Sequence, residues 1–133
     1  MVTVNRKIRE FSDIDLLFGI NNDTRDVNKK LNEDAIKQSI KNLILTKNYE
    51  RLFHPENGCQ ITSLLFENFD PTTVSIMEQS IRTTIDNLEP RAKVLNVKIV
   101  DNSDLNAIDV TVEFIPTNSN RPVSITTTIE RAR

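Results

Sequence analysis

Two rhythms of apolar residues divide the chain into a helical part and an extended part. Between residues 71 and 88 the apolar side chains recur every three or four positions, as on one face of a helix; they are Val74, Met77, Ile81, Ile85 and Leu88. After residue 92 apolar and polar residues alternate, which is the period of a strand. The change falls at Leu88-Glu89-Pro90-Arg91, where Pro90 must end the helix because it lacks an N–H. An acid and a base therefore flank a rigid corner.

Two more segments have helical spacing, residues 33–46 and a shorter one that we expect to end near Asn68. Their apolar stripes are Ile36, Ile40, Leu43 and Ile44 in the first, and Ile61, Leu64 and Leu65 in the second. Asn32 is the expected N-cap of the first helix. Before the long helix, Asp70 can cap the free N–H groups, and Pro71 suits the first helical position.

The alternating part predicts three strands. The inward residues are Leu95, Val97 and Ile99, then Ile108, Val110, Val112 and Phe114, then Val123, Ile125 and Ile129. Short, turn-rich connections favour an antiparallel meander, and the helices must cover its apolar face. We therefore predict an α+β fold: two main helices plus a short one, packed on a three-stranded antiparallel C-terminal meander. Residues 1–31 are expected as short extended N-terminal pieces packing on the single domain of residues 32–133, with the first few residues mobile.

Composition excludes several classes of function. Of the 133 residues, 17 are basic and 19 acidic, and the formal charge of -2 argues against a nucleic-acid surface. The N-terminus lacks the apolar core of a signal peptide, and no apolar run approaches the roughly 20 residues that span a bilayer. Cys59 is the only cysteine, so no internal disulfide forms. We expect a protein that is made and folded in a cytoplasm, without membrane or nucleic-acid partners.

Metal and thiol chemistry find little support. His54 and Cys59 could form a nucleophilic or metal-binding pair, but zinc usually takes three or four protein ligands and no further ligand has suitable spacing. A lone loop histidine is more often turn structure, and a lone cysteine before an apolar helix is more often buried. The two glycines could hardly form a phosphate-binding loop. We predict no catalytic residue, no cofactor and no metal.

Paired carboxylates support an enzymatic alternative, because a lysozyme-like peptidoglycan hydrolase needs only two of them. The candidates are Glu67, Asp70 and Glu89. Asp70, however, is expected to cap a helix. A pairing of Glu89 with Arg91 would lower the pKa that a general acid needs raised. Hydrolysis therefore remains the weaker alternative.

Two features suit binding. Arg91 is either a presented recognition group or one half of a local clasp with Glu89, and composition alone favours the clasp by about two to one. The Thr-rich last strand is either an ordinary edge or an edge that accepts a strand from another chain. The sequence leaves both choices open.

Four stretches together resemble a known family. They are Ile40-Lys41-Asn42-Leu43-Ile44-Leu45-Thr46, Phe53-His54-Pro55-Glu56-Asn57-Gly58-Cys59, Leu64-Leu65-Phe66-Glu67-Asn68 and Glu89-Pro90-Arg91. In this order they resemble the gene product twenty-five family of contractile-phage baseplate wedge proteins, which also includes a small subunit of type VI secretion baseplates. The resemblance spans roughly residues 35–115. Family members also carry a historical lysozyme label, which the residues here do not support.

The resemblance implies a tail sheath initiator, not an enzyme, located in the tail baseplate of a virion and assembled in the host cytoplasm. In the family, the Glu-Pro-Arg motif contacts a helical core bundle of neighbouring wedge subunits, so Glu89, Pro90 and Arg91 are the implied wedge-docking residues. The C-terminal strands of the family can accept a strand of the tail sheath protein. The implied sheath-facing strand lies within residues 122–130 and comprises Val123, Ile125, Thr127 and Ile129.

Overall fold

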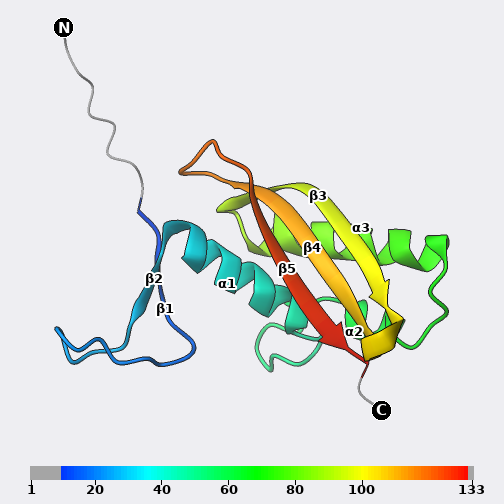
Figure 1. Cartoon of the computed structure of the whole chain (residues 1–133), viewed down its shortest axis with the longest axis horizontal. Coiled ribbons are helices and arrows are strands. Elements are labelled where there is room, and N and C mark those ends of the chain that lie inside the picture. The colour runs from blue at the N-terminus through cyan, green and yellow to red at the C-terminus, as the bar shows by residue number, and fades with distance from the viewer. Residues whose placement is uncertain (1–9, 132–133) are drawn as a thin grey trace, which may run out of the picture.

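The computed structural model describes residues 10–131, so the expected mobility of the first few residues lies outside the described part of the chain. Two short strands and three helices precede a C-terminal sheet (Figure 1). The elements are β1 (Ser12–Ile14), β2 (Lys29–Leu31), α1 (Asn32–Leu45), α2 (Ile61–Leu64), α3 (Pro71–Leu88), β3 (Ala92–Asn102), β4 (Ala107–Pro116) and β5 (Val123–Glu130). The predicted α+β class is confirmed.

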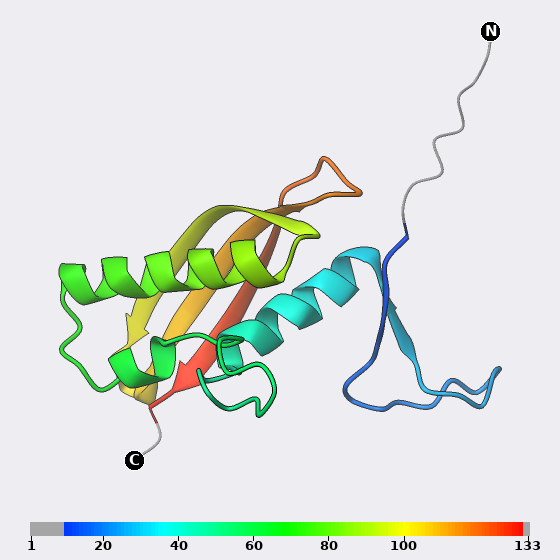
Figure 2. The same ribbon diagram turned by 180° about the vertical axis from the view of Figure 1, so that it is seen from behind.

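The sheet is the predicted antiparallel meander, in the order β3-β4-β5. Helices α1 and α3 lie on one of its faces (Figure 2). The core between the two layers includes several side chains with no exposed area, among them Val110, Val112 and Phe114 of β4 and Ile36, Ile40, Ile81 and Ile85 of the helices. Burying one such side chain contributes about 1.5–3 kcal/mol, so this shared apolar face holds the layers together.

Helix α3 follows the sequence prediction at both ends. The Asp70 carboxylate accepts a hydrogen bond from the backbone N–H of Thr73 at 2.7 Å, and Pro71 is the first helical residue. This contact lowers the pKa of Asp70, because it favours the ionised form. The helix ends at Leu88, and the backbone N–H of Glu89 closes the last turn on the carbonyl of Ile85 at 2.8 Å.

The start of α1 and the end of α2 differ from prediction. Asn32 is not an N-cap: it is the first residue of α1, has a φ of 47°, and follows Leu31 at the cap position. Its side-chain oxygen instead accepts hydrogen bonds from the backbone N–H of Phe11 at 3.2 Å and the side-chain amide of Asn118 at 3.0 Å. Helix α2 ends at Leu64 and not near Asn68; a turn follows it, and Leu65 is buried in that turn.

A β-bulge corrects the predicted inward face of β3. The register shifts between Val94 and Asn96. Alternate residues point inward on both sides of the bulge, but the extra residue offsets the alternation by one position. Val94, Val97 and Ile99 are buried, whereas 43% of Leu95 is exposed. Leu95 was predicted to share a face with Val97 and Ile99, and that prediction is wrong.

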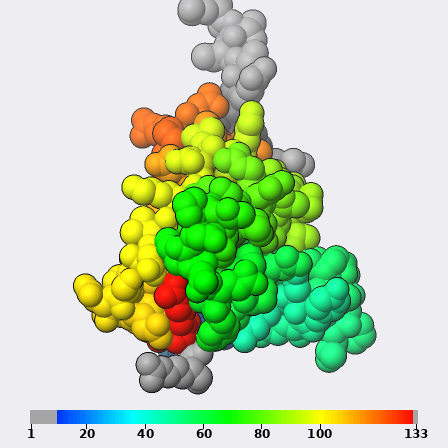
Figure 3. Space-filling view, turned by 90° about the vertical axis from the view of Figure 1, so that its right-hand side faces the viewer, coloured from blue at the N-terminus to red at the C-terminus, as the bar shows by residue number. Residues whose placement is uncertain are grey.

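The inward residues of β5 are those predicted, together with Thr127, which is 4% exposed. The C-terminal end of β5 lies between the start of α3 and the end of β3 (Figure 3). Arg131 fixes this end. Its guanidinium donates to Asp101 at 3.1 Å and lies 6.0 Å from the centre of the Phe69 ring.

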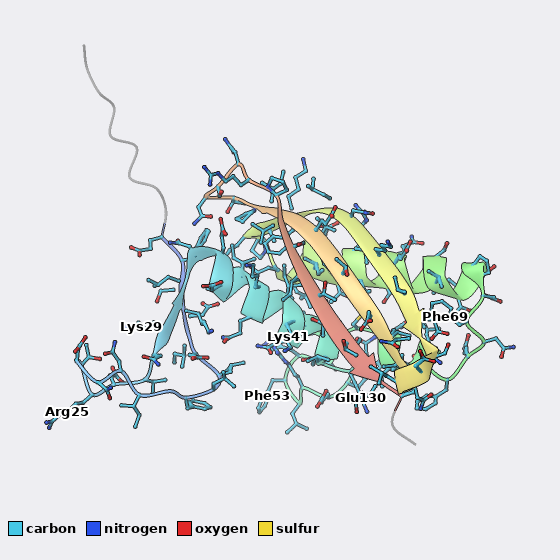
Figure 4. All side chains as sticks on the ribbon, viewed as in Figure 1. Arg25, Lys29, Lys41, Phe53, Phe69 and Glu130 are labelled. Atoms are coloured by element: carbon cyan, nitrogen blue, oxygen red, sulfur yellow. The ribbon has the colours of Figure 1, made fainter. Side chains whose placement is uncertain are left out.

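The N-terminal segment forms an antiparallel pair, β1 with β2, and is named here the N-terminal hairpin (residues 12–31). It contacts the beginning of α1, while its loop extends away from the sheet, with Arg25 near the far end (Figure 4). The loop exposes 86% of Leu17, 66% of Phe18 and 70% of Ile20. In the described residues, neither strand of the hairpin joins the C-terminal sheet, so the edges of that sheet stay uncovered.

Candidate functional site

The helix–strand corner (residues 89–91) is a closed ion pair. Glu89 is 3% exposed, and its two carboxylate oxygens accept hydrogen bonds from Nε of Arg91 at 2.7 Å and from Nη2 at 2.9 Å. The backbone N–H of Arg91 also donates to Glu89, at 3.3 Å. Because Pro90 holds the two residues on either side of a tight bend, the fork of the guanidinium meets both oxygens.

A second carboxylate, which the sequence did not indicate, completes this arrangement. Asp13 of β1 accepts hydrogen bonds from Nη1 and Nη2 of Arg91 at 3.2 and 3.1 Å. The guanidinium also lies 5.6 Å from the centre of the Phe11 ring. Residues 78 positions apart thus meet at one cation, and no local pattern could have indicated that pairing. The corner therefore fastens the N-terminal hairpin to the end of α3.

Charge at the corner is fixed by these contacts. Burial by itself raises the pKa of Glu89, but hydrogen bonds from Arg91 and from the Ser39 side chain outweigh it and hold the pKa below its ordinary value. The pKa of Arg91 is raised, chiefly by its hydrogen bond to Glu89. Glu89 consequently stays ionised, which is the wrong state for a general acid.

The corner nevertheless reaches the surface. Pro90 is exposed, and the side chain of Arg91 keeps 23% of its area accessible. The intramolecular clasp is therefore present, and docking of a partner at its exposed part stays a prediction.

The second candidate surface is the outer edge of β5. Val123, Ile125, Thr127 and Ile129 direct their side chains toward the helical layer, so the hydrogen-bonding groups along the edge itself are those of the backbone. The backbone N–H of Arg131 donates to the carbonyl of Asn106 at 2.8 Å, in register with the β4–β5 pairing. Alternation along the strand then turns the N–H of Thr127 toward β4. The N–H groups of Ser124, Thr126, Thr128 and Glu130 face the open edge.

The other edge of the sheet, β3, is obstructed. Its bulge at Leu95 interrupts the regular ladder, and Arg82 of α3 donates to the Leu95 carbonyl at 3.1 Å. Bulges and occupied carbonyls are devices that discourage strand addition. The two edges are therefore unlike, and β5 is the regular one.

The candidates for catalysis are not organised as a catalytic site. Asp70 caps α3, Glu89 is paired, and Glu67 is exposed in a turn. His54 lies 3.7 Å from Glu56 on the surface, whereas Cys59 is buried, with its sulfur 3.6 Å from the Ser80 hydroxyl. Within residues 10–131, no group of three or more His, Cys, Asp or Glu side chains could hold a metal ion. No helix in this part of the chain is long and apolar enough to cross a membrane.

Comparison with known proteins gives a consistent picture. Residues 30–121 match the family model described as Baseplate wedge protein gp25. The chain is 34% identical over 90 residues to baseplate wedge protein gp25 of Enterobacteria phage T4, a match that covers 68% of each protein.

Solved structures share the fold. A putative tail lysozyme from Geobacter sulfurreducens has a TM-score of 0.70 at 22% identity, over 76% of this chain and 92% of that one. A chain of the anti-feeding prophage baseplate has a TM-score of 0.63 at 20% identity, over 93% and 88%. A chain of the type VI secretion baseplate complex has a TM-score of 0.58 at 15% identity, over 72% and 92%. Because the family model covers most of the chain and the T4 relative covers two thirds of it, the chain belongs to the baseplate wedge protein gp25 family, structural subunits of contractile-tail baseplates.

Proposed function

We propose that this subunit joins two parts of a contractile tail: neighbouring wedge proteins at the Glu89–Arg91 corner, and the tail sheath protein at β5. The observation that carries the proposal is the regular, uncovered edge of β5 beside an obstructed edge of β3. An open edge offers backbone hydrogen bonds to an extended segment of another chain. By this route the first sheath subunits attach to the baseplate, and the protein catalyses no reaction.

The edge is tested by a proline at a position whose N–H faces outward. Thr126→Pro removes one outward donor and leaves the β4–β5 ladder intact, because an edge strand tolerates proline where its N–H faces solvent. We expect complete baseplates carrying this variant to fail to nucleate sheath, as counted by electron microscopy. Thr126→Val is the matched control, because it keeps the N–H. Normal sheath growth on Thr126→Pro baseplates would overturn the proposal.

Docking at the corner rests on the family resemblance and on the exposure of Pro90 and part of Arg91. Arg91→Lys keeps the positive charge beside Glu89 but loses the planar fork. We expect this variant to fold, by circular dichroism, and to be incorporated poorly into wedges. Arg121→Lys, in the exposed β4–β5 loop, is the control. A folded Arg91→Lys protein that enters wedges at the normal yield would make the docking role wrong, and an unfolded one would identify the corner as a clasp alone.

The absence of catalysis is tested with purified protein and peptidoglycan. The paired state and lowered pKa of Glu89 favour this part of the proposal, because a general acid needs the opposite shift. We expect no release of soluble fragments above the background of heat-denatured protein. Release that disappears in Glu67→Gln or Glu89→Gln would establish the hydrolase instead.

A further inference from the structure

A groove lies next to the open edge of β5, and the proposed function does not use it. Its cavity volume is about 410 Å³. Helix α1 contributes its floor, the N-terminal hairpin one wall, and Ile125 of β5 the other. Figure 1 shows the first half of α1 continuing beyond β5 toward the hairpin, so the helical layer is wider than the sheet on this side. A strand added to β5 would therefore lie above α1.

The groove has apolar walls and a positive rim. Leu16, Leu17 and Ile125 supply the apolar lining, and Lys30, Lys37 and Lys41 the charge. Figure 4 shows Lys41 on the part of α1 that lies next to β5. Its ammonium group and that of Lys30 make no ion pair with any of the described residues.

The lining also holds two carboxylates, Asp15 and Asp34. The Asp15 carboxylate accepts the backbone N–H of Leu17 at 3.2 Å, and Asp34 lies 3.9 Å from the ammonium of Lys37. Lys30, Lys37 and Lys41 against these two carboxylates give the lining a net charge of +1, and Lys30 and Lys41 form no ion pair with any described residue. The charge available in the groove is therefore positive, although the whole chain carries -2.

The wall formed by the hairpin is held in place. The side-chain amide of Gln38 on α1 donates to the Ile14 carbonyl at 2.8 Å and accepts from the Leu16 N–H at 3.4 Å. Arg91 anchors the same hairpin through Asp13. The groove thus exists before any partner binds, which reduces the entropy lost on binding.

We propose that this lysine groove (Lys30, Lys41, Leu16 and Ile125) selects the strand that pairs with β5. Alternate side chains of an added strand point to the same face, toward α1. The segment that fits carries an apolar residue against Ile125 and Leu16, and a carboxylate two positions away, facing the two lysines. This inference rests on the proposed function, because it assigns side-chain specificity to the same backbone edge.

The test measures binding of purified tail sheath protein to the full chain at several salt concentrations. Lys30→Glu/Lys41→Glu reverses both charges, and we expect it to weaken binding about tenfold or more at low salt. The deficit should shrink toward 1 M salt, where the Debye length is only about 3 Å. Lys41→Gln removes one positive charge without adding a negative one, so it should show a smaller loss of affinity. Lys93→Glu/Lys98→Glu on exposed positions of β3 makes the same charge change away from the groove and should bind normally.

Two results would overturn the inference, and they differ from failure of the edge proposal. If the groove variants bind as well as the β3 control while Thr126→Pro abolishes binding, the edge is right and the groove is wrong. If both sets of lysine variants lose affinity equally, only overall charge matters and the groove is again wrong. If Thr126→Pro binds normally, the edge proposal itself fails.

Discussion

The Glu89–Arg91 corner and the β5 edge satisfy their polar groups in opposite ways. At the corner, one guanidinium serves two carboxylates, one of them on a residue that is 3% exposed. At the edge, alternate backbone N–H groups of β5 face no other strand of residues 10–131. The polar groups of the corner are paired within the chain, whereas the outward backbone groups of the edge are left available to a partner.

This difference separates the expected effects of mutation. Removing one member of a buried, closed ion pair leaves a charge without its partner, so changes at the corner should act first on folding. A change that alters only outward backbone groups should leave folding almost untouched and act on assembly. A corner variant that affects only assembly, or an edge variant that affects only folding, would contradict this comparison.

The largest loss of stability is expected at the corner. Arg91→Ala removes the partner of buried Glu89 and of Asp13, and it should lower the free energy of unfolding by about 3–5 kcal/mol. Urea unfolding followed by circular dichroism measures this. A loss below about 1 kcal/mol, the value of a surface pair, would mean that the clasp contributes little.

The next effect distinguishes two neighbouring positions of β5. Thr127→Pro deletes an N–H that faces β4 and should cost about 3 kcal/mol, as proline does when it removes an internal hydrogen bond. Thr126→Pro should cost far less. Thermal unfolding of the two variants side by side is the measurement, and equal losses would show that the alternation of inward and outward N–H groups is assigned wrongly.

The third effect depends on pH. The pKa of Glu89 is lowered in the folded protein, so its contribution is present above the ordinary glutamate range and is lost as pH falls below that range. Glu89→Gln should therefore be less stable than the wild type at neutral pH, and the gap should close below about pH 4. Unfolding curves of both proteins from pH 7 to pH 3 test this, and a constant gap would contradict it.

A smaller effect of opposite sign is expected inside the sheet. The hydroxyl of Thr127 is buried and has no hydrogen-bond partner among the described residues. Thr127→Val replaces it with a methyl group of similar size, which should raise the free energy of unfolding by about 1 kcal/mol. Sheath nucleation should be unchanged, because the outward N–H groups remain. A destabilised Thr127→Val protein would mean that the hydroxyl has a partner after all.

The smallest effect on global stability is expected at the hairpin. Asp13→Asn weakens the partly exposed outer pair with Arg91 and leaves Glu89 paired, so it should cost less than about 1 kcal/mol. Limited proteolysis should nevertheless cut the loop of residues 15–28 faster, because the hairpin opens more often. An unchanged cleavage rate would show that Gln38 and Asn32 hold the hairpin without Arg91.

Sequence patterns predicted most of the elements, because their causes are local. Asp70, Pro71 and Pro90 act within a turn or two of their own positions, and the apolar stripe of α3 repeats inside one helix. The failures have non-local causes. The side chain of Asn32 does not cap α1, because it accepts hydrogen bonds from Phe11 and Asn118. The bulge at Leu95 depends on the pairing of β3 with β4.

The candidate surfaces divide in the same way. The sequence by itself determined that a helix must end at Pro90 beside two opposite charges, and that a Thr-rich strand closes the meander. Only the tertiary structure decided that Asp13 completes the ion pair, and that β5 and not β3 is the regular edge. Both outcomes depend on groups that lie far apart in the sequence. Such contacts form only when the whole chain packs, so no local segment can indicate them.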